Sequence, residues 1–269
     1  MHKNKISDSK QKANKSSISK NKENRNHTPK RNRKKQLRLR IGIFLAICIC
    51  AAVIAQNRWE MLSYLGYPQA LIEKAYRYPE ARGYVLKYPF YKNRHQNIDV
   101  SGELVEGEIP LFLQWDSRWG YENYGASFIG VLGCGPTALS MVYCGLTGDA
   151  SMNPYVMARY AEENGYYVQG AGTSWDFMST GAEKLGLTVH SIGNSKEAIL
   201  NALSQQMPLI SIMTPGDFTV SGHFLVLTGI DTDGGIRILD PNSKEKSEKT
   251  WDIEVLTSQM AAAWAYEVR

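Results

Sequence analysis

The stretch VLGCGPTALSMVYCG, residues 131–145, places Cys134 between two glycines and follows it with a proline and an apolar helical pattern. Pro136 suits the first turn of a helix, where its missing N–H is not needed. We therefore predict that Cys134 lies at a helix N-terminus, where unpaired N–H groups and the helix dipole favour a thiolate over a thiol. Gly133 and Gly135 have no Cβ, so the backbone of a substrate can approach the sulfur closely.

The same stretch also allows a simpler interpretation of its two cysteines. Taken alone, Cys134 is equally well explained as a small buried residue in a tight turn. Cys144 follows ten residues later, which is about 15 Å along one helix and beyond the roughly 7 Å between Cα atoms that a disulfide spans. We therefore expect both thiols to be free, with Cys144 as a core residue.

The charge of the chain is concentrated at its N-terminus. Residues 1–40 contain 15 Lys and Arg against Asp8 and Glu23, a local charge of +13, whereas the remaining 229 residues sum to −8. This block is rich in Lys, Asn and Ser and nearly free of apolar residues, as is typical of a disordered tail. Nucleic-acid binding would require a folded basic face. We therefore predict a disordered basic cytoplasmic tail and no nucleic-acid partner.

An uninterrupted apolar run, IGIFLAICICAAVIA at residues 41–55, follows Arg38 and Arg40 directly. We predict a transmembrane signal anchor over residues 41–57, with the N-terminus in the cytoplasm and the remaining chain outside the cell. Fifteen helical residues rise only about 22 Å against a hydrocarbon core of about 30 Å. A signal peptide cleaved after Val53-Ile54-Ala55, which would release the protein, is therefore the first alternative. A buried core helix is the second.

Residues 58–108 have the pattern of a helical, partly irregular connector. PQALIEKAYRYP, residues 68–79, has helical periodicity, and Pro79 and Pro89 interrupt later turns. We expect its tyrosines to pack against the main domain, namely Tyr64, Tyr67, Tyr76, Tyr78, Tyr84, Tyr88 and Tyr91. Whether this segment is a spacer or a cover for a cleft stays open.

The main domain, residues 109–269, shows helical patterns first and strand patterns last. Beyond the helix at Cys134, the helical patterns are residues 153–165, 174–186 and 195–207. The strand patterns are residues 208–213, 223–230 and 236–240, of which the last two form a hairpin through the turn DTDGG. We expect residues 252–267 to form a final helix. This order favours an α+β fold, in which the helices are segregated from an antiparallel sheet.

A thiol nucleophile needs a base within hydrogen-bonding reach, and His223 is the candidate. It begins the apolar strand pattern HFLVLTGI, a position where a histidine is more often a core or edge residue. Reflection through a turn centred near Thr232 and Asp233 places its cross-strand partner near residue 242 and puts Asp240 on the same face. Asp240 and Asn242 are therefore both eligible to orient the histidine.

The other candidate site residues come from two further segments. Gln114, flanked by Trp115 and Trp119, is a neutral donor that suits an oxyanion site, although the residues alone favour an ordinary surface amide. The segment GYYVQGAGTSW, residues 165–175, has no lysine at P-loop spacing, so we expect it to line a substrate cleft with Trp175. Gly222 is assigned to the same cleft. No paired-ligand spacing such as CxxC or HExxH is present, so we expect no metal and no cofactor.

Four motifs in order resemble one family of enzymes. They are IPLFLQWDSRWGYENYG (109–125), GCGPTALSMVYCGLTGD (133–149), GHFLVLTGID (222–231) and ILDPNS (238–243). They resemble the papain-like cysteine peptidases related to bacteriocin-processing, double-glycine-leader peptidases. The resemblance implies a papain-like fold, with the nucleophile helix packed on an antiparallel sheet. It also implies four roles: Cys134 as nucleophile, His223 as general base, Asp240 as the orienting acid and Gln114 as the oxyanion donor.

The resemblance also shapes the expected function. The leader-processing relatives usually sit at the cytoplasmic end of an export transporter, whereas this chain shows no transporter or ATP-binding segment and its domain is predicted outside. We therefore expect a stand-alone, membrane-anchored form from Gram-positive bacteria, a monomer that hydrolyses a peptide or protein substrate through an acyl-enzyme. Peptidyl or acyl transfer, and non-catalytic peptide binding on the same scaffold, are the alternatives.

Overall fold

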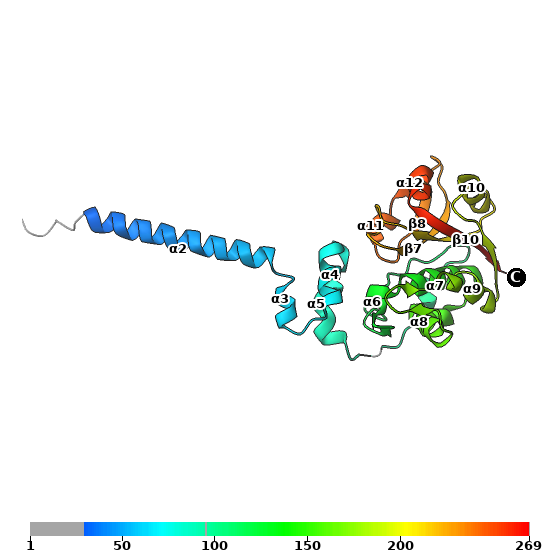
Figure 1. Cartoon of the computed structure of the whole chain (residues 1–269), viewed down its shortest axis with the longest axis horizontal. Helices are drawn as coiled ribbons and strands as arrows, with labels where there is room; N and C mark the ends of the chain where they lie inside the picture. Colours follow the sequence, from blue (N-terminus) through cyan, green and yellow to red (C-terminus); the bar gives the residue numbers. More distant parts are fainter. Residues whose placement is uncertain (1–29, 95, 269) are drawn as a thin grey trace, which may run out of the picture. The chain divides into compact units, whose positions relative to one another are not determined.

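The computed structural model describes residues 30–94 and 96–268, and the chain divides into two units, Met1–Arg58 and Trp59–Arg269 (Figure 1). The first unit contains helix α2 (Lys30–Gln56). Within it, Arg33–Ala55 is long and apolar enough to cross a membrane, judged by length and composition. The basic residues 30–40 belong to this helix rather than to the predicted disordered tail, because Lys, Arg and Leu extend a helix readily. The rest of that predicted tail, residues 1–29, lies outside the described residues.

The second unit begins with short helices that pack together around aromatic side chains. They are α3 (Met61–Tyr64), α4 (Gln69–Arg77), η1 (Pro79–Ala81) and α5 (Arg82–Tyr91), and the single turn η2 (Ser101–Glu103) follows them along the chain. Tyr84 and Tyr91 stack on Tyr121, with ring centroids 4.4 and 5.5 Å apart. The prediction that the tyrosines pack inward is wrong for Tyr64 and Tyr76, which are 89% and 43% exposed.

The larger part of this unit is built on a six-stranded antiparallel sheet. Its strand order is β5-β10-β6-β7-β8-β9. The strands are β5 (Leu187–Ser191), β6 (Leu209–Met213), β7 (His223–Ile230), β8 (Ile236–Leu239), β9 (Thr250–Trp251) and β10 (Met260–Val268). Two short hairpins lie outside it: β1 (Asn123–Tyr124) with β2 (Ser127–Phe128), and β3 (Tyr167–Val168) with β4 (Gly172–Thr173).

Helices cover both faces of the sheet (Figure 1). Side chains alternate between the two faces along each strand, and the central strands have apolar side chains on both faces, so each face needs a covering layer. Ile210, Ile212, Phe224 and Val226 pack in one cluster with α7, and their strand neighbours Leu209, Met213, Leu225 and Leu227 pack with α10 and α12. The helices of this part are α6 (Ile129–Leu132), α7 (Cys134–Thr147), η3 (Ala150–Met152), α8 (Pro154–Glu163), η4 (Trp175–Phe177), α9 (Thr180–Lys184), α10 (Lys196–Ser204), α11 (Lys244–Ser247) and α12 (Ile253–Ser258).

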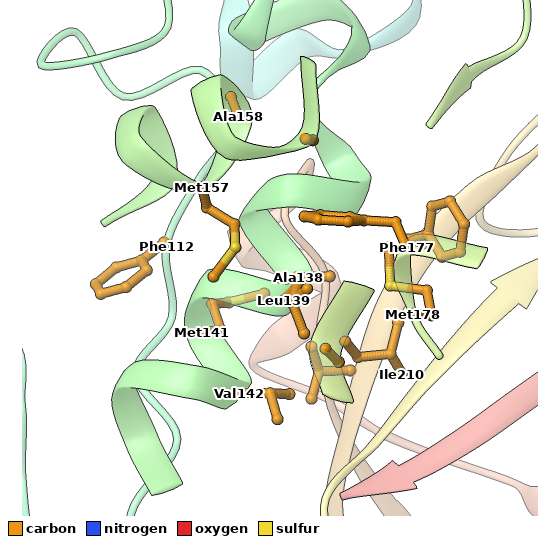
Figure 2. Packing of buried hydrophobic residues seen from close by; sticks show 14 of the residues in the cluster. Phe112, Ala138, Leu139, Met141, Val142, Met157, Ala158, Phe177, Met178 and Ile210 are labelled. Atoms are coloured by element: carbon orange, nitrogen blue, oxygen red, sulfur yellow. The ribbon is translucent and has the colours of Figure 1, made fainter. Parts of the chain in front are cut away.

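Helix α7 is the centre of the larger core. Figure 2 shows Leu139 and Met141 of α7 close to Met157 of α8, with Phe177 and Ile210 at the edge of the same cluster. These side chains are fully buried, so the position of the helix that begins at Cys134 is set by packing on the sheet and on α8. Dense packing of this kind leaves a helix little freedom to shift.

The predicted final helix over 252–267 is wrong beyond its first turns. Helix α12 ends at Ser258, and the chain continues as β10, which pairs with β5 on one side and β6 on the other. Strand β10 buries Ala263, Trp264, Ala265 and Tyr266 in succession, with side chains entering both cores. The alanines of this segment favour a helix, but burial on both faces of an interior strand overrides that weak propensity.

Two smaller differences concern chain segments beside the sheet. The helix predicted over 174–186 is divided into η4 and α9, and strand β5 was not predicted. The hairpin of β7 and β8 and the buried strand β6 lie where the sequence predicts them.

Candidate active site

Cys134 is the first residue of α7, immediately after Gly133, as the position of Pro136 in the first turn predicts. The thiol is partly exposed, and it lines a cavity of about 500 Å³. Cys144 lies on the same helix, is fully buried and is likewise a free thiol. The two cysteines therefore occupy different environments on one rigid helix.

His223 and Asp240 form a buried pair beside this cavity. The ring nitrogen Nε2 of His223 lies 2.6 Å from Oδ1 of Asp240, and the residues are 3% and 0% exposed. The pairing of β7 with β8 reaches Val226 opposite Leu239, and Asp240 follows directly in a tight turn in which the N–H of Ser243 donates to the carbonyl of Asp240. The carboxylate of Asp240, rather than the amide of Asn242, is the group that contacts the ring.

The charged forms of Cys134, His223 and Asp240 stabilise one another. Burial alone raises the pKa of the Cys134 thiol, but the hydrogen bond and charge of His223, with backbone hydrogen bonds at Phe224 and Gly135, bring the net pKa below its usual value. Burial lowers the pKa of His223, but the negative charge and hydrogen bond of Asp240, with those of Cys134, outweigh it and raise the pKa to about 10. The arrangement therefore favours a thiolate beside an imidazolium.

Gln114 enters the same cavity from the segment before β1. Its side chain is 1% exposed, so the alternative of a surface amide is wrong. Its Nε2 donates to the carbonyl of Gly130 at 3.2 Å, which uses one of the two N–H groups of the amide. The backbone N–H of Gln114 donates to the carbonyl of Pro241 at 2.7 Å, so this segment is tied to the loop that carries Asp240.

Of the four residues predicted to lie at a substrate cleft, two line the cavity and two do not. Trp175, 49% exposed, and Gly222 line the cavity, whereas Gly133 and Gly135 do not. A Cβ on Gly135 would lie 2.7 Å from the side chain of Thr173, and one on Gly133 would lie 2.5 Å from the Ile129 carbonyl. These two glycines are therefore needed for close packing at the start of α7.

The tryptophans that flank Gln114 do not line the cavity. Trp119 is fully buried in the core, and its indole N–H donates to the carbonyl of Leu113 at 2.9 Å. Trp115 donates to the carbonyl of Asn242 at 3.1 Å. Both tryptophans fix the backbone around Gln114 rather than line the cavity.

Helix α4 supplies one wall of the cavity through Lys74 and its neighbours; the sequence left open whether residues 58–108 cover a cleft and did not single out Lys74. Lys74 is only 4% exposed, and its ammonium donates to Oδ1 of Asn242. The signal for it was present: Lys74 lies between Leu71, Ile72 and Ala75 on the apolar face of the helical pattern. A lysine on such a face is seldom buried without a partner.

The family is identified by comparison with known proteins. Residues 106–268 match the model of the family described as "Peptidase_C39 like family". The chain belongs to this family. It is therefore a cysteine-type peptidase, and the papain-like α+β fold implied by the four sequence motifs is confirmed.

A solved structure similar to this Peptidase_C39-like chain is the peptidase domain of Streptococcus ComA, described as a bi-functional ABC transporter involved in a quorum sensing pathway. The two are 21% identical with a TM-score of 0.42, and the match covers 60% of this chain and all of that domain. The search of curated proteins found no match. The family match begins at residue 106, so α4 and Lys74 lie outside it.

Proposed function

We propose that this peptidase hydrolyses peptide bonds through a triad of Cys134, His223 and Asp240. The observation that carries the proposal is the buried hydrogen bond between His223 and Asp240 beside a cysteine whose pKa is lowered. A nucleophile, a base and a group that orients the base are the three parts that covalent catalysis of acyl transfer needs.

The contacts suggest the order of steps. Because Nε2 of His223 is engaged by Asp240, Nδ1 is the ring nitrogen left for Cys134. The Cys134 sulfur attacks the substrate carbonyl carbon, and the protonated His223 then gives its proton to the leaving amine as the C–N bond breaks. A water molecule, deprotonated by His223, attacks the thioester and releases the free carboxylic acid and the thiol.

Gln114 is proposed as the oxyanion donor, together with the backbone N–H of Cys134 at the start of α7. The proposal is supported by its burial in the cavity and by the N–H of Nε2 that Gly130 does not engage. Loss of one such donor costs about 100-fold or more in kcat. We expect Gln114→Ala to lower kcat by that factor while the pH dependence of kcat is kept.

Isotope incorporation tests hydrolysis directly. The full chain in detergent micelles is incubated with a peptide library in water enriched in oxygen-18, and the products are measured by mass spectrometry. Hydrolysis places one heavy oxygen in each new carboxyl terminus, because water resolves the acyl-enzyme. Products joined to added amines, without heavy oxygen, would instead establish peptidyl transfer. An absence of any new terminus, with retention of intact peptides, would favour a binding module.

We also propose that the peptidase domain lies outside the cell, with α2 as a membrane anchor. The apolar length of Arg33–Ala55 and the basic residues that precede the apolar run support this orientation. Protease added to intact cells should digest the peptidase domain, whereas cells expressing a cytoplasmic control protein should keep that control intact. Protection of the peptidase domain until lysis would contradict this orientation, and a mature chain beginning after Ala55 would establish a cleaved signal peptide.

A further inference from the structure

Lys74 of α4 is connected to the carboxylate of Asp240, the proposed orienting acid, by two hydrogen bonds in series. Its ammonium donates to Oδ1 of Asn242. The backbone N–H of Asn242 donates to Oδ1 of Asp240 at 2.7 Å, and the same oxygen contacts His223. The ammonium therefore holds the residue whose backbone helps to fix the Asp240 carboxylate.

A second contact from the same segment holds the loop that follows Asp240. Oε1 of Glu80 accepts from the hydroxyl of Ser243. Its Oε2 accepts the backbone N–H groups of Lys244 and Glu245 at 2.9 and 3.0 Å. Lys74 and Glu80 thus form hydrogen bonds with residues 242–245, which follow the proposed catalytic carboxylate of Asp240 in the chain.

The environment of Lys74 argues against a merely structural contact. Burial lowers the pKa of its ammonium to about 7, although the negative charges at Cys134 and Asp240 act in the opposite direction. Oδ2 of Asp240 is buried and has no hydrogen-bond partner among the described residues. Burying a lysine ammonium carries a desolvation cost, and such costs are concentrated at functional sites.

We propose that Lys74 is a positioning residue of the peptidase: its ammonium fixes Asn242 and the Asp240 loop, and its charge favours the thiolate of Cys134. On this basis the segment preceding the family region is part of the active site and not a spacer. The inference rests on the proposed triad, since positioning has meaning only if Cys134 and Asp240 act in catalysis. Lys74 and Cys134 line the same cavity, and Coulombic attraction is reciprocal, so a thiolate there that stabilises the ammonium is stabilised by it.

The effect of Lys74 depends on pH, because the pKa of its ammonium is lowered to about 7. The titratable groups that share its surroundings are Glu73 and Arg77 of its own helix, Tyr78 directly after that helix, Cys134 of α7, His223 of β7 and Asp240 after β8. Below about pH 7 Lys74 is charged and supports the thiolate; above it, the ammonium loses its proton and this support declines. An arginine at this position keeps its charge through the whole range.

Three variants of the full chain separate charge from hydrogen bonding. Lys74→Arg keeps both, Lys74→Gln keeps a donor without charge, and Lys74→Met removes both. Lys87→Met is the control, because Lys87 is an exposed lysine of the neighbouring helix α5. For each, kcat and KM on a peptide substrate and the rate of Cys134 alkylation by iodoacetamide are measured from pH 5 to pH 10.

We expect Lys74→Met to lower kcat at pH 6 by about tenfold or more, the ratio that one pKa unit represents, with KM changed less than twofold to threefold. Lys74→Gln should lie between Lys74→Met and wild type in kcat. Alkylation of Cys134 should require a higher pH in both uncharged variants. In Lys74→Arg, alkylation at pH 6 should stay near the wild-type rate, and kcat should decline less above pH 7 than in wild type.

The outcomes distinguish this inference from the proposed function. If wild type cleaves peptides but Lys74→Met and Lys74→Gln keep its kcat and pH profile, the positioning role is wrong. If wild type shows no cleavage and Cys134 reacts no faster than Cys144, the proposed triad itself is wrong. Should Lys74→Met fail to fold, the comparison of Lys74→Gln with Lys74→Arg decides, since these two differ in charge while both retain a donor.

Discussion

Replacement of Cys134 by alanine should abolish peptide-bond hydrolysis, with kcat falling by about 10⁴-fold or more, because the variant has no group that can form the thioester. Removal of a nucleophile from a catalytic triad leaves only the rate supplied by binding and by the oxyanion donors. The measurement is the initial rate of peptide cleavage by the purified full chain in detergent micelles. Product termini are quantified by mass spectrometry, so that low rates remain visible.

Cys144→Ala is the matched control for this variant. Cys144 lies on the same helix, but burial raises the pKa of its thiol to about 11, and its sulfur contacts the carbonyl of Met152 rather than a base. The control should keep kcat within about threefold while losing some stability, because it removes a buried side chain from the core. Equal activity in wild type and Cys134→Ala would show that another residue carries the reaction.

Alkylation provides a second readout of the same prediction that needs no substrate. At pH 6 iodoacetamide should modify Cys134 far faster than Cys144, since the pKa of the first thiol is lowered and that of the second is raised. Equal rates for the two sites would contradict the proposed thiolate. The modified positions are read from peptide masses.

The helix that begins at Cys134 and the hairpin that begins at His223 could be predicted from the sequence, because each depends on residues that are close together in the chain. Pro136 and the apolar residues after it predict where α7 begins, and the turn DTDGG predicts the hairpin of β7 and β8 that brings Asp240 near His223. The motifs quoted for the family also lie within short, separate segments of the chain, so each can be recognised locally. Short-range pattern and long-range geometry agree at these positions.

The parts that could not be predicted depend on contacts between distant residues. Strand β10 reads as a helix because Ala261, Ala262 and Ala263 have high helix propensity, and only pairing with β5 and β6 decides against it. The burial of Lys74 depends on Asn242, a partner 168 residues away. The requirement for glycine at residue 135 depends on Thr173, which no spacing rule connects to α7.

Replacement of His223 should have the second large effect. We expect His223→Ala to lower kcat by about 10³-fold to 10⁴-fold, because the thiol loses both its base and the imidazolium that donates the proton to the leaving amine. The pH at which the rate of Cys134 alkylation by iodoacetamide is half-maximal should rise. The hydrogen bond and the charge of His223 lower the pKa of Cys134 most, and this variant removes both. His190→Ala is the control, since the His190 side chain is half exposed, its Nε2 lies 2.8 Å from Oε1 of Glu267, and it does not line the cavity.

Stability against pH gives an independent test of the same histidine. The pKa of His223 is raised from 6.5 to about 10 in the folded chain, so its protonated pairing with Asp240 stabilises the fold fully below about pH 6.5. That contribution declines as pH rises through the folded pKa, because the native state then releases the proton that it held more tightly than the unfolded state. The lowered pKa of Cys134 has the opposite pH dependence, so the comparison is made in the Cys134→Ala background. There the free energy of unfolding of the chain with His223, minus that of the chain with His223→Gln, measured by urea titration, should decrease as pH rises above 6.5. A constant difference would contradict a protonated pairing of His223 with Asp240.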